Sequence, residues 1–438
     1  MDNDRHGPRH TPKIDPTRRP VRHPIGAVDV ADPGNPGRAE WAAAGLEAPD
    51  MDVVRRYRLA RIREQLKARD FAAGLLYDPL NIRYATDTSN MQVWCMHNPV
   101  RYCFIATEGP VILFDFHGCG HLSADFPLVD ETRPGLSWFY FGAGPKERER
   151  AKLWAAEIAD LVRAHGGGNT RLAIDKCDQD GVSALEDQGI NCHSSQEFTE
   201  EARKIKHPEE VKAMRRAIQT TEVAMAGMWR ALEPGITENQ LWSILHQVNI
   251  ARGGEWIETR LLASGPRTNP WFQECSDRVI EAGDIVSFDT DLIGPYGYCA
   301  DLSRAWVTPG KSPSNEQIAL HAMAMEQLGH NMELLKPGMG FIEFAEKSYV
   351  LPEDYYPNRY SAIIHGVGLC DEYPAVGYPG DEKKAGYDGT FEPGMCICFE
   401  SYIGRTGGRE GVKLEQQTLV TETGIERLDG FTMSLTGE

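Results

Sequence analysis

The segment VSFDTDLIG, residues 286–294, carries two aspartates, Asp289 and Asp291, in an otherwise apolar stretch. Side chains alternate across a β-strand, so a strand here would place both carboxylates on one face and Thr290 on the other. Two negative charges on one face repel each other unless a cation lies between them. The segment therefore predicts a strand that presents two carboxylates to a metal ion.

The residues that follow predict a hairpin. GPYGY, residues 294–298, is typical of a tight turn, and CADLSRAWV, residues 299–307, is typical of a second strand. A strand that folds back in this way brings Asp301 beside the first pair. We expect three oxygen donors on this hairpin.

Three more donors stand in apolar, strand-like stretches further along the chain, namely His365 in IIHGVG, Glu400 in CICFESYIG and Glu415 in GVKLEQQTLV. Any one of these charged residues, taken alone, is more often a surface residue or a salt-bridge partner. Ionisable groups inside strand-like stretches are rarely buried without a partner. Five carboxylates and one imidazole in this order favour a metal site.

From about residue 200 to its end, the chain resembles the pita-bread-fold metallohydrolases, the group of methionine aminopeptidase, aminopeptidase P, prolidase and creatinase. The ligand order of that group is Asp, Asp, His, Glu, Glu, and Glu400 and Glu415 match its last two ligands. The first ligand stays open, because the peptidase aspartates are eleven positions apart. Asp301 lies twelve positions after Asp289 and ten after Asp291. We therefore keep both as candidate ligands.

Two histidines of the peptidases, which hold the substrate and the tetrahedral intermediate, have no counterpart here. The segment that would carry the first reads SGPRTNPWF, with Trp271 and Phe272 in that place. The segment that would carry the second reads HGVGLCDEYP, with Asp371 and Glu372 where the histidine is expected. A centre that keeps its ligands and lacks these histidines suits a different reaction.

The combination resembles the pita-bread-fold dimethylsulfoniopropionate lyases of marine bacteria. The resemblance implies a lyase that forms dimethyl sulfide and acrylate by β-elimination, with Asp371 as the base. It also implies two divalent transition-metal ions held by Asp289, Asp291, Asp301, His365, Glu400 and Glu415. Iron is the first expectation, and manganese, cobalt and zinc suit the same donors.

A small-molecule onium carboxylate is the expected substrate. A quaternary onium group cannot donate hydrogen bonds, so aromatic faces recognise it, each contributing roughly 0.5–2 kcal/mol. The candidate contacts are Tyr360, Trp271, Phe272 and Tyr373, and packing is the alternative role for each.

The 438 residues and 41% hydrophobic content predict two domains of mixed α and β structure. Residues 1–50, rich in Pro, Arg and Gly, predict an extended arm. Residues 51–200 alternate helix and strand patterns and resemble the N-terminal domain of prolidases and creatinase. Residues 201–438 are the expected pita-bread catalytic domain, in which PG turns after two long helices form a weak internal repeat. The resemblance suggests a homodimer.

The net charge of −18 argues against nucleic acid and anionic membrane surfaces as partners. No apolar run is long enough to span a membrane, and the N-terminus lacks an apolar signal core, so we expect a cytoplasmic protein. The ten cysteines are scattered without a CxxC pair, which predicts reduced thiols.

Three other functions stay open at this stage. A proline-specific aminopeptidase or prolidase would keep the metal and need another residue, such as His330 or His97, in place of the missing histidines. A binding protein without activity and a metal-free amidinohydrolase of the creatinase type are disfavoured, because such proteins tend to lose ligands.

Overall fold

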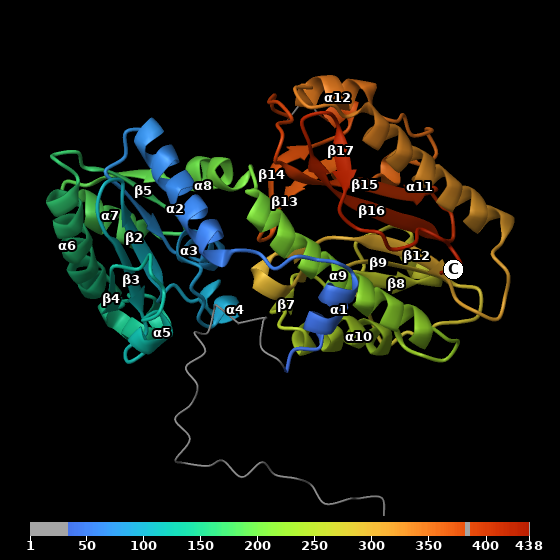
Figure 1. Ribbon diagram of the computed structural model, residues 1–438, viewed down its shortest axis with the longest axis horizontal. Helices are drawn as coiled ribbons and strands as arrows, with labels where there is room; N and C mark the ends of the chain where they lie inside the picture. The colour runs from blue at the N-terminus through green and yellow to red at the C-terminus, as the bar shows by residue number, and fades with distance from the viewer. Residues whose placement is uncertain (1–33, 382–385, 438) are drawn as a thin grey trace, which may run out of the picture.

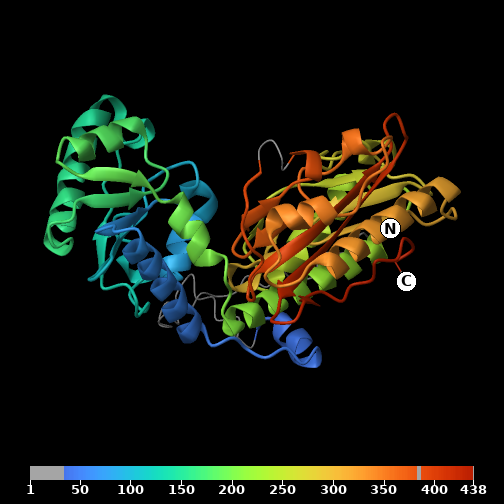
Figure 2. The ribbon, with the colours of Figure 1, turned by 90° about the horizontal axis from the view of Figure 1, so that it is seen from above.

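The computed structural model describes residues 34–381 and 386–437, which form two lobes side by side (Figure 1). The N-terminal lobe comprises residues 51–203 and the C-terminal lobe residues 208–381 and 386–437. A second view, turned by 90°, separates the same two lobes (Figure 2). Helix α8 runs across residue 200, where the sequence places the domain boundary, so that boundary stays a prediction.

The N-terminal lobe is built on a mixed six-stranded sheet in the order β4-β3-β2-β1-β5-β6. Its strands are β1 Ala73–Leu76, β2 Tyr102–Ala106, β3 Val111–Asp115, β4 Glu131–Pro134, β5 Arg171–Ile174 and β6 Asn191–Ser194. Its helices are α2 Met51–Ala68, α3 Pro79–Thr86, α4 Gln92–Cys95, α5 Tyr140–Ala143, α6 Glu147–His165, α7 Gln179–Glu186 and α8 Gln196–Arg203. The apolar side chains of alternate strand positions pack against α2 and α8 on one face and against α6 and α7 on the other.

The C-terminal lobe contains a five-stranded sheet, in the order β14-β13-β15-β16-β17, and two three-stranded sheets, β12-β9-β8 and β11-β10-β7. Its strands are β7 Trp256–Ile257, β8 Leu262–Ser264, β9 Ile285–Asp289, β10 Leu292–Ile293, β11 Cys299–Ala300, β12 Ser303–Val307, β13 Ile364–Val367, β14 Asp371–Val376, β15 Cys396–Gly404, β16 Gly411–Val420 and β17 Ile425–Arg427. Its helices are α9 Pro208–Ala231, α10 Glu238–Ala251, α11 Asn315–Leu334 and α12 Phe341–Lys347. One apolar core joins α9 and α10 to β8–β12, and a second joins α11 and α12 to β13, β15 and β16.

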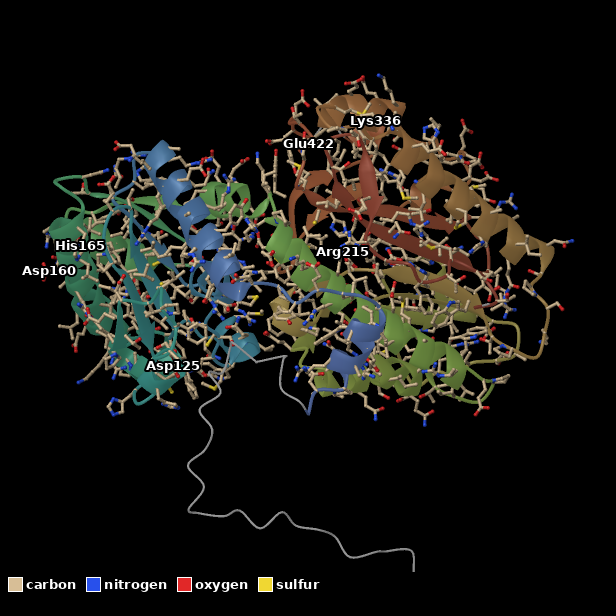
Figure 3. The ribbon with its side chains drawn as sticks, viewed as in Figure 1. Asp125, Asp160, His165, Arg215, Lys336 and Glu422 are labelled. Carbon is tan, nitrogen blue, oxygen red and sulfur yellow. The ribbon has the colours of Figure 1, made fainter. Side chains whose placement is uncertain are left out.

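The two helix pairs form the internal repeat that the sequence predicts. In each pair a long helix ends before a Pro-Gly turn whose glycine has a positive φ, 105° at Gly235 and 85° at Gly338. The connection between the helices has the same length in both pairs. Thr237 and Gln240 form the predicted capping box of α10. The labelled Arg215 on α9 pairs with Glu426 on β17 at 2.6 Å, which ties the first pair to the large sheet (Figure 3).

Part of the predicted extended arm is helical. Residues 1–33 lie outside the described residues, but α1, Gly37–Ala43, follows them. Trp41 of α1 is fully buried, and its Nε1 donates to the carbonyl oxygen of Arg216 on α9 at 3.2 Å. The end of the arm therefore docks on the C-terminal lobe of the same chain.

All ten cysteines are free thiols. Within residues 34–381 and 386–437, no helix has the length and apolar character needed to cross a bilayer.

Candidate metal centre

The predicted hairpin is present, but its first strand is shorter than expected. Strand β9 ends at Asp289, which pairs with Ser303 on β12, and Asp291 has a left-handed φ of 35°. Thr290 causes the break, because its hydroxyl donates to the Ala300 carbonyl at 2.8 Å and accepts from the Leu302 amide at 3.0 Å. The expectation of one continuous strand with both aspartates on one face was therefore wrong.

The three carboxylates of the hairpin nevertheless meet. One oxygen each of Asp289, Asp291 and Asp301 lie within 4.8 Å of one another, and all three residues are buried. Thr259 donates to Asp291 Oδ2 at 2.6 Å and so holds the carboxylate that leaves the strand. The backbone break thus re-aims Asp291 without removing it from the cluster.

The large sheet supplies the other three donors. Glu400 on β15 lies directly opposite Glu415 on β16, and His365 on β13 lies opposite Cys398 on β15. His365 Nε2 is 3.2 Å from Glu400 Oε1, 3.5 Å from Asp301 Oδ2 and 3.7 Å from Glu415 Oε1. The structure therefore brings all six predicted ligands into one buried centre.

The donors fit a divalent metal pair. Oδ1 of Asp289, Oδ1 of Asp301 and Oε1 of Glu415 are buried without a hydrogen-bond partner, which is costly for a carboxylate unless a cation binds it. The donors form overlapping groups, including Asp289 with Glu400 and Glu415, and Asp301 with His365 and Glu415. There are three such groups among the described residues, and Asp289, Asp301 and Glu415 each belong to two of them, so these carboxylates could serve more than one ion.

The pKa values of the buried carboxylates also indicate that this centre binds a cation. Burial, together with the neighbouring carboxylates, raises the pKa of Asp301 and Glu415 well above the usual values. Burial alone would raise the pKa of Asp289, but the ammonium of Lys413 together with hydrogen bonds to Glu415 and Asp301 lowers that pKa to about 2. A bound cation would stabilise the ionised form of every ligand in the same way.

Lys413 is a residue of the centre that the sequence reasoning missed. Its Nζ is fully buried and lies 2.6 Å from Glu400 Oε2 and 3.0 Å from Asp289 Oδ2. It also donates to the Ser303 hydroxyl at 2.6 Å. The signal was its position two residues before Glu415, which places both side chains on one face of the strand.

Asp371, the predicted base, lies at the open side of the centre. Its side chain is 53% exposed, and its Oδ1 is 3.7 Å from His365 Nδ1. It lines a cavity of about 410 Å³ together with His365, Tyr360 and Tyr373. A carboxylate in this position can reach both a molecule in the cavity and the edge of the metal centre.

The predicted aromatic contacts divide into two sets. Tyr360 and Tyr373 line the cavity, and Phe272 stacks on Tyr360 with 5.1 Å between ring centroids. The structure does not bring Trp271 to the cavity, because its ring is buried and packs 5.9 Å from Tyr402.

A further cavity residue, Tyr387, was missed. It stacks on Tyr373 with 5.5 Å between centroids, and nothing in its surrounding sequence indicated this.

Neither histidine suggested for a hydrolase lies at this centre. His330 Nε2 is exposed and bonds to the Lys347 carbonyl at 3.0 Å. His97 lies on the N-terminal lobe, where its ring neighbours Trp94 at 6.5 Å.

Comparison with known proteins identifies the family. Residues 212–422 match the model of metallopeptidase family M24. The dimethylsulfoniopropionate lyase DddP of Roseovarius nubinhibens is 46% identical over 397 residues, which cover 90% of this chain and 89% of the relative. The chain belongs to this lyase family. The lyase DddP of Roseobacter denitrificans is 44% identical over the same shares of both chains.

The solved structures show the fold of the family. An Xaa-Pro dipeptidase from Bacillus anthracis superposes with a TM-score of 0.71 at 21% identity, over 86% of this chain and 98% of that one. The prolidase from Pyrococcus furiosus has a TM-score of 0.65 at 20% identity, over 84% of this chain and 99% of that one. The predicted lyase family and pita-bread fold are thus confirmed. The M24 match and the carboxylate clusters support a site for divalent metal ions.

Proposed function

We propose that this chain cleaves dimethylsulfoniopropionate to dimethyl sulfide and acrylate by base-catalysed β-elimination. The observation that carries the proposal is the position of Asp371, which faces a cavity beside a ligand histidine, at the place where peptidases keep a catalytic histidine. The 46% identity to a lyase named for this substrate supports it.

We assign the metal ligands to Asp289, Asp291, Asp301, His365, Glu400 and Glu415. When bound there, two divalent cations would neutralise a substrate carboxylate and make the neighbouring C–H group more acidic. Lys413 adds a fixed positive charge on the inner side of the same cluster. The bound cations would thus lie against the substrate carboxylate, with Lys413 behind their ligands and Asp371 on the cavity side.

Asp371 acts as the general base. It takes a proton from the carbon next to the substrate carboxylate, the C–H electron pair forms the carbon–carbon double bond, and the C–S pair leaves with sulfur. The sulfonium thereby departs as neutral dimethyl sulfide, and the proton passes from Asp371 to solvent. No water molecule attacks the substrate, so the missing peptidase histidines are not needed.

The aromatic wall of the cavity binds the onium group. The stacked pair Tyr373 and Tyr387 lines the cavity beside the base. Tyr360 lines it too, with Phe272 stacked on its ring and the Lys413 ammonium 4.5 Å from its centroid, so its part of the wall is the ring edge and the hydroxyl. A sulfonium attracted to aromatic faces gains about 0.5–2 kcal/mol for each ring. Trp271 is buried elsewhere, and we leave it out of this wall.

Iron is the metal we propose, with manganese, cobalt and zinc as alternatives that fit the same oxygen and nitrogen donors. We also propose a homodimer, as the family resemblance suggests. A location in the cytoplasm stays the expectation from the sequence.

The test is an assay of the purified, metal-analysed protein with dimethylsulfoniopropionate, in which gas chromatography detects dimethyl sulfide and acrylate is followed in parallel. We expect release that stops on addition of a chelator. Asp371→Asn and Asp371→Ala should lower kcat by at least about a hundredfold while metal content stays unchanged. Asp180→Asn is the matched control, because Asp180 is a partly exposed aspartate of the N-terminal lobe, far along the chain from the metal centre.

A metal-loaded protein that releases no dimethyl sulfide would refute the lyase proposal. Hydrolysis of Xaa-Pro dipeptides by that protein would then replace it with the peptidase alternative. Loss of metal from the Asp371 variants, or full activity in them, would refute the assignment of Asp371 as the base.

A further inference from the structure

Glu372, the neighbour of the proposed base, points the opposite way into the protein. Both residues lie on β14, where alternation turns successive side chains to opposite faces. The side chain of Glu372 is 1% exposed, against 53% for Asp371. A fully buried carboxylate directly beside a catalytic carboxylate requires a reason.

Glu372 is held by two buried cations, one at the end of α8 and one in the linker between the lobes. Arg203, the last residue of α8, donates from Nε to Glu372 Oε2 at 3.0 Å. Lys206, which precedes α9, bonds the other oxygen of Glu372, and its Nζ also donates to the Arg203 carbonyl at 2.7 Å. Charge-assisted bonds of this kind, once desolvated, are short and directional.

The strand that carries the base needs this support because it is an edge strand. β14 pairs with β13 on one side, and no strand of the described part of the chain pairs with its other side. Its pairing is also interrupted, since the register shifts between His365 and Gly366. Helix α8 packs on this free edge and restrains β14 there. Besides Arg203, its Glu200 Oε2 accepts a hydrogen bond from the Tyr373 amide at 2.9 Å.

The glycines after the ligand histidine make room for the same arrangement. A Cβ on Gly368 would collide with the Glu372 carboxylate, and a Cβ on Gly366 would collide with the carbonyl oxygens of Glu372 and Tyr373. The strand that carries His365 and the strand that carries Asp371 are therefore in close contact through Glu372.

The network also reaches the N-terminal lobe. Arg203 bonds the side-chain oxygen of Asn81 on α3, and Asn81 in turn donates to Asp175 at 2.9 Å. A continuous path of buried polar contacts thus runs from the N-terminal lobe through Arg203 to the strand of the base.

We propose that Glu372, clamped by Arg203 and Lys206, is a positioning residue that fixes Asp371 over the reacting carbon. The inference rests on the proposed function, because it takes Asp371 to be the base. Proton abstraction demands placement within about 0.5 Å, and an error of about 1 Å can cost a hundredfold in rate. Because Arg203 belongs to the N-terminal lobe, the position of Asp371 also depends on how that lobe packs against the C-terminal lobe.

The test measures kcat, KM and metal content for Glu372→Gln and Asn81→Ala, with substrate either unlabelled or deuterated next to the carboxylate. For Glu372→Gln we expect at least a tenfold lower kcat, a KM changed less than about twofold and unchanged metal content. The deuterium isotope effect on kcat should rise, because a displaced base makes proton transfer rate-limiting. Asn81→Ala should show a smaller change of the same kind.

Glu197→Gln is the matched control, since Glu197 lies on α8, the helix that carries Arg203, but pairs with Arg69 at the surface. Wild-type kcat and isotope effect in Glu372→Gln would overturn the proposal, as would a loss confined to metal content or KM. Glu372→Gln could fail to fold, because two buried cations lose their partner. In that case Asn81→Ala decides: a lower kcat with a larger isotope effect and unchanged metal content supports the proposal, and wild-type kcat and isotope effect overturn it.

An inactive wild-type protein would instead overturn the proposed function. An active wild type with an inactive Asp371→Asn variant separates the two questions, because it establishes the base whatever Glu372 does.

Discussion

Lys413 shows at the scale of single residues how the centre tolerates five buried carboxylates. Burial alone would lower the pKa of its ammonium group, but Asp289, Glu400 and Glu415 raise it well above the usual value. The lysine therefore stays charged, and it offsets part of the repulsion among its neighbours.

Replacing this lysine should destabilise the protein. In Lys413→Met, Asp289 and Glu400 lose a cation that lies within 3.0 Å of each. Breaking a buried ion pair by removing one partner costs about 3–5 kcal/mol, so we expect the free energy of unfolding of metal-free protein to fall by that amount in urea titrations.

Lys67→Met is the control for that substitution. Lys67 pairs with Glu108 at 3.3 Å in an exposed position, where the loss should stay below about 1 kcal/mol. Equal effects of the two substitutions would contradict the role assigned to Lys413.

Asp175 predicts a pH dependence of stability that is independent of the metal centre. Burial raises its pKa to about 6, although Asn81 and the Tyr77 amide donate to it. Its pKa in the unfolded chain is about 3.9, so between about pH 4 and pH 6 the folded protein binds the extra proton. The free energy of unfolding should therefore decrease as the pH rises through this window, by an amount on the order of 3 kcal/mol.

Asp175→Asn should remove that slope. We would compare urea unfolding of the wild type and the variant at pH 4, 5 and 6.5, and take the difference between them at each pH. A difference that does not change between these pH values would show that Asp175 does not titrate in this window.

Two glycines show how the packing of a strand or a helix decides the effect of one added methyl group. In Gly366→Ala the new methyl group would meet carbonyl oxygens of the bulged β14 strand, so β13 and β14 must separate. We expect a lower free energy of unfolding and a lower kcat, because both His365 and Asp371 lie on these strands.

Gly329→Ala provides the contrasting case. Gly329 lies inside α11, and a Cβ there meets no described atom within 4 Å. Alanine in the interior of a helix should raise stability by about 0.5–1 kcal/mol without changing kcat. Thermal unfolding and the lyase assay on both variants check the pair, and equal changes in both would refute the argument.

The starts of helices were predictable from the sequence where neighbouring residues in the chain determine them. Thr237 with Gln240 begins α10 and Pro208 begins α9, as capping preferences indicate. The break at Asp289 was not predictable, because the bonds of Thr290 to Ala300 and Leu302 exist only after the hairpin has closed. The alternation of apolar and polar residues along one strand cannot predict a break in that strand that is caused by hydrogen bonds to the next strand.

Metal binding should stabilise the whole molecule. The centre joins the hairpin sheet to the large sheet, since Asp289 on β9 and Glu415 on β16 come from different sheets and each contains a buried oxygen without a partner. An ion bound only by the folded protein adds about 2.7 kcal/mol when its free concentration is a hundred times Kd. We expect added Fe²⁺ or Mn²⁺ to raise the melting temperature of chelator-treated protein.

Glu415→Gln should abolish most of that metal-dependent increase, because Glu415 belongs to two of the three donor groups. Melting curves of the wild type that coincide with and without metal would contradict a site that spans the two sheets.

The sequence by itself predicted the candidate ligands and their order, and it determined the family and the pita-bread fold. These follow from motifs that stand along the chain and from their resemblance to those of known families. Only the tertiary structure decided which oxygens lack partners, that Lys413 lies among the ligands, and that Tyr387 rather than Trp271 lines the cavity. It also decided that Glu372 is clamped behind Asp371. Those facts depend on contacts between segments far apart in the chain, and such contacts form only when the lobes and sheets pack and exclude water.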